Sequence, residues 1–214
     1  MKKYVFLLMG LLLLLPSVIQ GKVVSGIQYD MNLSLSYPLV YTANETAQYN
    51  INTDIAKYVE AAKATYYHGG AYSVRTKYIV TYEDDNVVSI ILKRFDDFRG
   101  AHPVDRCYAL VYDKQTGNRI PLNNFIQIDS VTQLNKFLQT RKFPVYNYRY
   151  ERLYAFHKPT RISSDYYLMG SGIIGLLYQP YELASYSNGM VTIVFTPEAI
   201  DYMNRLKTTD YYRE

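Results

Sequence analysis

The sequence predicts an α+β fold, in which a mixed or antiparallel sheet packs with two to three helices and a signal peptide precedes the domain. Three observations predict it. Apolar and polar side chains alternate in several runs, as is typical of strands. One stretch repeats apolar residues every three or four positions, as is typical of a helix. Residues 1–25 begin with a lysine pair and continue as an apolar run.

Residues 1–25 predict a secretory signal peptide. A short basic start, Met1 to Lys3, precedes an apolar segment from Val5 to Ile19, and small residues follow it. The alternative is a retained membrane anchor, but a spanning helix needs about 20 apolar residues, and Pro16 interrupts this run too early. We therefore expect a secreted or periplasmic protein of the cell envelope, which contacts a membrane only through its leader if that leader stays uncleaved.

Composition excludes several classes of protein. The 214 residues are 49% hydrophobic and 20% charged, a globular balance that rules out wholesale disorder. Two of the four net positive charges are Lys2 and Lys3 of the leader, so we expect no nucleic-acid partner. One cysteine and three histidines rule out a disulfide scaffold and a cysteine-rich zinc module. The unusual count is 25 tyrosines beside no tryptophan.

The N-terminal part of the domain, residues 26–98, predicts a strand, a helix and a hairpin. The alternation from Ile27 to Leu35 predicts one half-buried strand. Asn44 is the expected N-cap of the helix. The hairpin has strands over residues 72–82 and 87–95, joined by an acidic turn. The buried stripe expected on the helix consists of Ala47, Ile51, Ile55, Val59 and Ala62.

The C-terminal part, residues 99–214, predicts three more strands and two helices. The expected strands cover residues 104–112, 166–178 and 190–195. A modest helix is expected to begin at Asp129 or Ser130 and to reach Phe137 or Phe143. A last helix is expected from Pro197, since proline favours the first helical position. The segment 146–159 fits an extended stretch or a long arm.

The sequence contains no catalytic set, no metal-binding motif and no cofactor motif. His68, His102 and His157 lie far apart and outside any zinc-binding spacing, so we expect separate structural or surface roles for them. Asp84-Asp85 fits a solvated turn. Cys107 lies in a strand-like run, so we expect a small buried side chain, with a catalytic thiol as the alternative.

Tyrosine is the remaining signal. The rings of Tyr146, Tyr148 and Tyr150 recur at every second position, which on a strand would place them on one face. Such a row can stack on sugar rings or form a protein-binding face, because tyrosine combines a large area with a polar tip. The alternative is that tyrosine simply fills amphipathic strand positions. Both interpretations stay open for this segment.

Two short motifs give the chain a family resemblance. Gly100-Ala101-His102-Pro103 precedes the strand that leads to Tyr112-Asp113, and Gln179-Pro180-Tyr181-Glu182-Leu183-Ala184 follows near the C-terminus. With these motifs in this order, the chain resembles the extracellular domain of the RsiV-type anti-sigma factors, which is shared with the N-terminal region of PdaC-type peptidoglycan deacetylases. The family usually has Gly-Gly-Ala-His, whereas Arg99 stands at the first of these positions here.

The resemblance implies a compact α+β domain on the outer side of the cytoplasmic membrane. In RsiV this domain binds lysozyme, and in PdaC a separate catalytic domain carries the metal site. We therefore expect a non-enzymatic envelope binding domain whose partner is a lysozyme-like protein or peptidoglycan. Its candidate ligand-binding residues are Tyr146, Tyr148, Tyr150, His102 and Tyr181.

Two other functions stay open. The first is a metal- or histidine-dependent cell-wall hydrolase or deacetylase that uses His102 with Asp97 or Asp105. The second is a structural envelope protein whose partner is another exported chain. Neither function has a sequence signature of its own.

Overall fold

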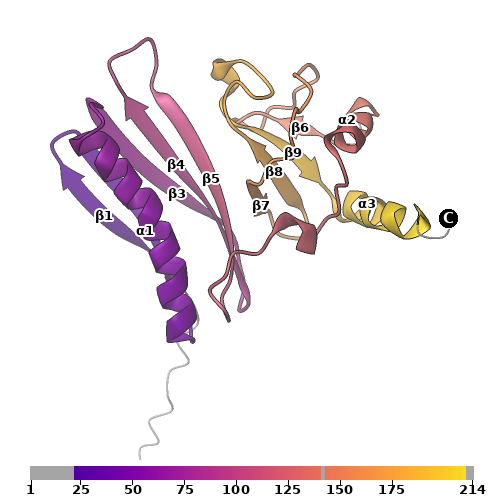
Figure 1. The fold of residues 1–214 in the computed structure, drawn as a ribbon, viewed down its shortest axis with the longest axis horizontal. Coiled ribbons are helices and arrows are strands. Elements are labelled where there is room, and N and C mark those ends of the chain that lie inside the picture. Colours follow the sequence, from indigo (N-terminus) through magenta and orange to yellow (C-terminus); the bar gives the residue numbers. More distant parts are fainter. Residues whose placement is uncertain (1–21, 141–142, 211–214) are drawn as a thin grey trace, which may run out of the picture.

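Two sheets and three helices make up the part of the chain that the structure describes, which comprises residues 22–140 and 143–210 of a computed structural model (Figure 1). Sheet A has the strand order β1-β2-β3-β4-β5 and sheet B has the order β6-β9-β8-β7. The strands of sheet A are β1 (Lys22–Asp30), β2 (Leu33–Tyr41), β3 (Ser73–Glu83), β4 (Val87–Asp97) and β5 (Val104–Asp113). Those of sheet B are β6 (Val145–Tyr146), β7 (Tyr166–Leu168), β8 (Ile174–Tyr178) and β9 (Val191–Phe195). The helices are α1 (Glu45–Tyr67), α2 (Val131–Gln139) and α3 (Pro197–Asp210), with the 3-10 turns η1 (Leu122–Asn124) and η2 (Tyr186–Asn188).

The predicted α+β fold with a mixed sheet is confirmed, although the strands form two sheets. In sheet A, β2 and β3 are parallel over a short register, Leu33–Leu35 beside Val74–Thr76, and the other strand pairs are antiparallel. The division predicted between residues 98 and 99 falls before β5. Because β5 pairs with β4 along its whole length, it belongs to sheet A together with the N-terminal strands.

Most of the predicted signal peptide lies outside the described residues. Strand β1 begins at Lys22, which pairs with Tyr41, so residues 22–25 form part of sheet A. Within residues 22–140 and 143–210, none of the helices has the length and apolar character needed to cross a membrane.

Helix α1 confirms the prediction for its cap and its buried face. Asn44 Oδ1 accepts hydrogen bonds from the backbone N–H groups of Thr46 at 3.0 Å and Ala47 at 3.2 Å, which satisfies two donors that the first helical turn leaves free. The five predicted stripe residues are the buried residues of this helix. Because they recur every three or four positions, they form one apolar face that packs on sheet A.

The two C-terminal helices begin where the sequence predicts. Ser130 caps α2, since its Oγ accepts from the backbone N–H of Gln133 at 3.1 Å, and Pro197 is the first residue of α3. Helix α2 ends at Gln139, before Phe143.

Two of the predicted strands are in fact hairpins. The alternation from Ile27 to Leu35 passes through a turn at Met31, which has φ of 43° and is 95% exposed. Residues 166–178 split into β7 and β8 at Gly170-Ser171-Gly172, where all three φ angles are positive. The predictions of single strands were wrong because both arms of a hairpin keep a period of two, so alternation alone does not reveal the reversal.

The helices and sheets are stacked in layers (Figure 1). Helix α1 covers one face of sheet A, sheet B packs against the other face, and α2 and α3 lie beyond sheet B. Strand β8 shows how alternation builds these layers. Leu176 packs in the core that contains Leu134 of α2 and Met203 of α3, whereas Leu177 packs against Cys107 of sheet A.

Cys107 is buried between the two sheets, as predicted. Burial raises the pKa of its thiol to about 12, so the thiol stays protonated at neutral pH and behaves as a small apolar side chain.

Side chains of Gln179 and Asp165 from the sheet B half, and of Arg119 from the segment that follows β5, complete part of the outer edge of β5. Gln179 Oε1 accepts from Cys107 N at 2.9 Å, and Gln179 Nε2 donates to Cys107 O at 2.6 Å. Two residues along, Asp165 Oδ1 accepts from Ala109 N at 3.0 Å and Arg119 Nη2 donates to Ala109 O at 2.8 Å. These side chains make hydrogen bonds that a sixth strand would otherwise make, and those of Gln179 and Asp165 hold the two sheets together.

Replacing Gln179 by alanine tests this connection. The change leaves the N–H and C=O of Cys107 without their partners, and an unsatisfied buried polar group costs about 1–3 kcal/mol. We expect Gln179→Ala to lower the free energy of unfolding by about that amount in urea denaturation. Gln139→Ala, at an exposed position of α2, is the control, with an expected change within about 0.5 kcal/mol. Equal stability of the two variants would contradict the role of Gln179.

Candidate functional site

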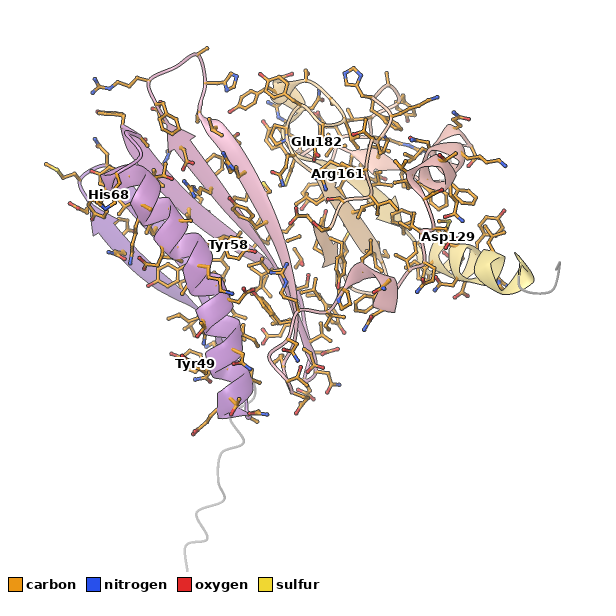
Figure 2. All side chains as sticks on the ribbon, in the orientation of Figure 1. Tyr49, Tyr58, His68, Asp129, Arg161 and Glu182 are labelled. Carbon is orange, nitrogen blue, oxygen red and sulfur yellow. The ribbon has the colours of Figure 1, made fainter. Side chains whose placement is uncertain are left out.

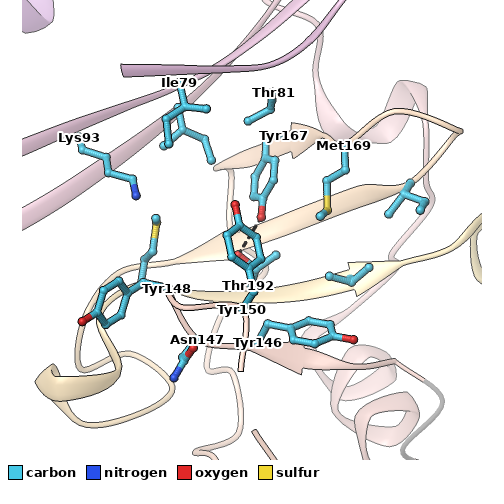
Figure 3. A pocket seen from close by; sticks show the side chains of 14 residues that line it. Ile79, Thr81, Lys93, Tyr146, Asn147, Tyr148, Tyr150, Tyr167, Met169 and Thr192 are labelled. Carbon is cyan, nitrogen blue, oxygen red and sulfur yellow. Dashed lines mark hydrogen bonds between the residues drawn. The ribbon is translucent and has the colours of Figure 1, made fainter. Parts of the chain in front are cut away.

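A pocket of about 230 Å³ lies between the face of sheet A that α1 leaves uncovered and the facing side of sheet B (Figure 3). Sheet A contributes Ile79 and Ile91, which are paired across β3 and β4. The sheet B half contributes Val194 of β9 and, just outside its strands, Met169 and Met190. These five side chains give the pocket an apolar floor.

Tyrosines cover the other side of this pocket. Tyr146, Tyr148 and Tyr150, the residues singled out by their alternating pattern, all line it together with Tyr167 (Figure 3). Tyr167 is buried, and its hydroxyl donates to Thr192 Oγ1 at 3.2 Å; burial raises the pKa of Tyr167 above its ordinary value. Because Tyr148 is 42% and Tyr150 71% exposed, these two rings form the mouth.

The three tyrosines converge through a turn and not along one face of a strand, so that part of the prediction was wrong. Strand β6 ends at Tyr146. Asn147 Oδ1 then accepts from the backbone N–H groups of Arg149 at 2.9 Å and Glu151 at 3.0 Å. Tyr150 N donates to Asn147 O at 3.0 Å, and Tyr150 has φ of 62°. An asparagine that bonds to the backbone beyond it favours such a turn over an extended strand.

Two glycines make room for the rings of the pocket. At Gly175 on β8, a Cβ atom would lie 2.6 Å from Cζ of Tyr167. At Gly189, which has φ of 60°, a Cβ atom would lie 2.7 Å from Cδ1 of Tyr148. Both distances are too short for a side chain, so the positions of these two rings depend on glycine.

His102 and Tyr181 form a second group, outside the lining of the pocket. The His102 ring stacks on Tyr186 with centroids 3.8 Å apart and an interplanar angle of 20°. Its Nε2 lies 3.0 Å from the Tyr181 hydroxyl and its Nδ1 lies 2.9 Å from the carbonyl oxygen of Pro103. The candidate residues thus separate into a tyrosine pocket and a histidine cluster. The segment with η2 connects them, since Tyr148 N donates to Asn188 O at 3.2 Å.

Glu182 shapes the turn that presents Tyr181. Its Oε2 accepts from Gln179 N at 2.7 Å, and its Oε1 forms an ion pair with Arg161 at 2.7 Å; Figure 2 labels both partners of that pair. Tyr181 itself has φ of 72° and is 62% exposed. In the motif Tyr181-Glu182, Glu182 therefore stabilises the turn, and Tyr181 exposes its ring to solvent.

Asp105 lies beside the histidine cluster, and one of its carboxylate oxygens lacks a hydrogen-bond partner. This oxygen, Oδ1, is buried. Burial raises the pKa of this carboxyl above its ordinary value of 3.8, and the hydroxyl of Tyr186 and the charges of His102 and Arg75 oppose that rise. In residues 22–140 and 143–210, no group of three or more His, Cys, Asp or Glu side chains is placed to hold a metal ion.

Sequence reasoning missed Tyr167, Lys93 and the two methionines of the pocket. Tyr167 lies in a strand, as many other tyrosines do, and no local pattern shows which strands face each other. One signal was present in Gly175, which the β7–β8 register places opposite Tyr167. That signal has meaning only after residues 166–178 are recognised as a hairpin.

Two sheets that face each other, covered by helices on both outer sides, define the class of this protein as a layered two-sheet α+β domain. A member of the DUF3298 family from Bacteroides fragilis has this fold, with a TM-score of 0.58 and 14% identity over 86% of this chain and 92% of that chain. A DUF3298 family protein from Pseudomonas aeruginosa matches with a TM-score of 0.54 and 11% identity over 85% and 92%.

At these identities the likeness shows a shared fold, which fits the predicted resemblance to RsiV- and PdaC-type domains at a coarse level. No protein-family model and no curated protein matches the sequence.

The partly buried carboxyl of Asp105 predicts a pH-dependent effect on stability. A carboxyl whose pKa is raised by folding destabilises the fold above that pKa and has no such cost below 3.8, its ordinary value. We expect Asp105→Asn to raise the free energy of unfolding at pH 7 by a few tenths of a kcal/mol, because solvent screens much of the effect at a partly exposed carboxyl, and the gain to vanish at pH 3. Urea denaturation at both values measures this. Asp85→Asn, on an exposed turn, should change neither, and a loss of stability in Asp105→Asn at pH 7 would refute the assignment.

Proposed function

We propose that this protein is a non-enzymatic binding domain of the bacterial cell envelope, and that it binds the glycan of peptidoglycan in the pocket between its sheets. The observation that carries the proposal is the convergence of Tyr146, Tyr148, Tyr150 and Tyr167 on one pocket. Tyrosine rings offer flat apolar faces for a sugar ring, while their hydroxyl groups stay available for hydrogen bonds.

The size and the polar groups of the pocket fit a single sugar ring. Its volume of about 230 Å³ is below the roughly 300–1,000 Å³ typical of sites for drug-sized ligands. Asn147, Thr81 and Thr192 lie among the apolar lining residues, and a few polar groups of this kind orient a ligand. One ring enters the pocket, and the rest of the glycan runs along the open mouth beside Tyr148 and Tyr150.

The environment of Cys107 supports a role without catalysis by this thiol. The thiol is buried, with its pKa raised to about 12, whereas a cysteine nucleophile must be deprotonated and within reach of its substrate.

The predicted leader supports a place in the cell envelope, and the resemblance to RsiV- and PdaC-type domains supports a cell-wall ligand or a lysozyme-like partner. The second candidate function, binding of a lysozyme-like protein, is favoured by one observation. Tyr150 projects from a turn with 71% of its surface exposed, which suits insertion into the sugar-binding cleft of another protein.

The experiment is a calorimetric titration of residues 22–214 with soluble peptidoglycan glycan fragments and, in parallel, with hen lysozyme. We expect Tyr150→Ala to weaken glycan binding about 3- to 10-fold, because an aromatic contact contributes about 0.5–1.5 kcal/mol. The control is Tyr49→Ala, since Tyr49 is 69% exposed on α1 (Figure 2) and lies across sheet A from the pocket. An equal effect of both variants, or no glycan binding at all, would contradict the proposal, and binding of lysozyme alone would favour the second candidate.

A further inference from the structure

We infer that the tyrosine pocket selects sugars that carry a negative charge, a carboxylate or a phosphate, and that Lys77 and Lys93 of sheet A bind that charge. The inference rests on the proposed function, since it adds a charge requirement to the same glycan site.

The register of the β3–β4 hairpin places the two lysines together. Lys77 pairs with Lys93, and the next pair on the same face is Ile79 with Ile91. Residues directly opposite each other in antiparallel strands have Cβ atoms about 4.5–5.5 Å apart. Ile79, Ile91 and Lys93 line the pocket, so Lys77 stands next to its lining, on the face that α1 leaves uncovered.

Neither lysine has a carboxylate partner within the described part of the chain. The cations of the ion pairs in residues 22–140 and 143–210 are other lysines and arginines. Arg75, which is exposed two residues before Lys77 on the same strand, adds a third positive charge to this face. Like charges directly opposite each other destabilise a sheet, and a bound anion would relieve that repulsion.

The position of the charges relative to the rings indicates what the ligand looks like. Lys93 reaches from sheet A toward the side of the pocket that carries the tyrosines (Figure 3). At the mouth, Arg149 Nε donates to the Tyr148 hydroxyl at 2.8 Å, so a further cation borders the rings. A neutral sugar would stack on the rings and leave the lysines unpaired. A sugar with an acidic substituent would stack and also form charge-assisted hydrogen bonds.

Lysine presents a compact point charge and does not impose the planar geometry that distinguishes arginine. The site therefore predicts an anionic sugar without choosing between a carboxylate and a phosphate, and the two must be compared directly. Two pairs of probes do so. N-acetylglucosaminyl-N-acetylmuramic acid differs from chitobiose by a lactyl group with its carboxylate, and N-acetylglucosamine 6-phosphate differs from N-acetylglucosamine by its phosphate.

The test is a titration of residues 22–214 with these four probes at low ionic strength. We expect the charged member of at least one pair to bind about 5- to 10-fold more tightly, which corresponds to about 1–1.4 kcal/mol. In the double variant Lys77→Gln/Lys93→Gln the ratio should fall to about 1, because the charged probe loses more affinity than the neutral probe. The control Lys57→Gln/Lys63→Gln removes two charges from α1 and should keep the ratio.

A second readout needs no ligand. Because the like-charge pair is removed, the Tm of Lys77→Gln/Lys93→Gln should rise by about 1–3 °C at low salt, and the rise should shrink in about 1 M NaCl, where charges are screened within about 3 Å. The single variant Lys77→Gln, at an exposed position, serves the same comparison if the double variant folds poorly.

The outcomes separate this inference from the proposed function. Equal binding of charged and neutral probes, or a preference that survives in the double lysine variant, overturns the inference and leaves glycan binding intact. Absence of binding by all four probes overturns both.

Discussion

The outer edge of β5 is the constraint on which the arrangement of the two sheets depends. Backbone N–H and C=O groups at a buried sheet edge must find partners, and here Gln179, Asp165 and Arg119 supply them. Gln179 follows β8 and Asp165 precedes β7, so the bonds that satisfy β5 also fix sheet B. The apolar contact of Leu177 with Cys107 completes this joint.

The contact between β5 and the sheet B half determines where the pocket lies. Strand β7 contacts β5, β4 and β3, and Tyr167 fills the space between the sheets at this side. Farther from β7, the turn that follows β6 faces sheet A. Its rings, Tyr148 and Tyr150, line the pocket. The pocket therefore combines a floor of strand residues on sheet A with a wall of tyrosines, and hydrogen bonds of Asn147 hold the turn that carries Tyr148 and Tyr150.

The sequence predicted best what depends on neighbouring residues alone. The stripe of α1, its cap at Asn44 and the hairpin of β3 and β4 are local patterns, and the structure confirms them. The turn at Met31 escaped prediction, because no glycine marks it and the alternation continues through it. The gathering of tyrosines with Lys93 also escaped, since it depends on the contact between sheets, and no single segment encodes that contact. His102 and Tyr181 do meet, although as a cluster separate from the pocket.

The different treatment of the two outer strands of sheet A has a consequence for assembly. Polar side chains occupy the outer backbone groups of Cys107 and Ala109 in β5, and the backbone of residues 118–120 bonds to Val111 and Asp113, so this part of the edge offers no template for strand addition. Strand β1 hydrogen-bonds to β2 on one side, and the described chain places no strand on its other side. Strand β1, which also carries the exposed Ile27 and Tyr29, is therefore the outer strand of sheet A that keeps the backbone pattern needed for strand addition.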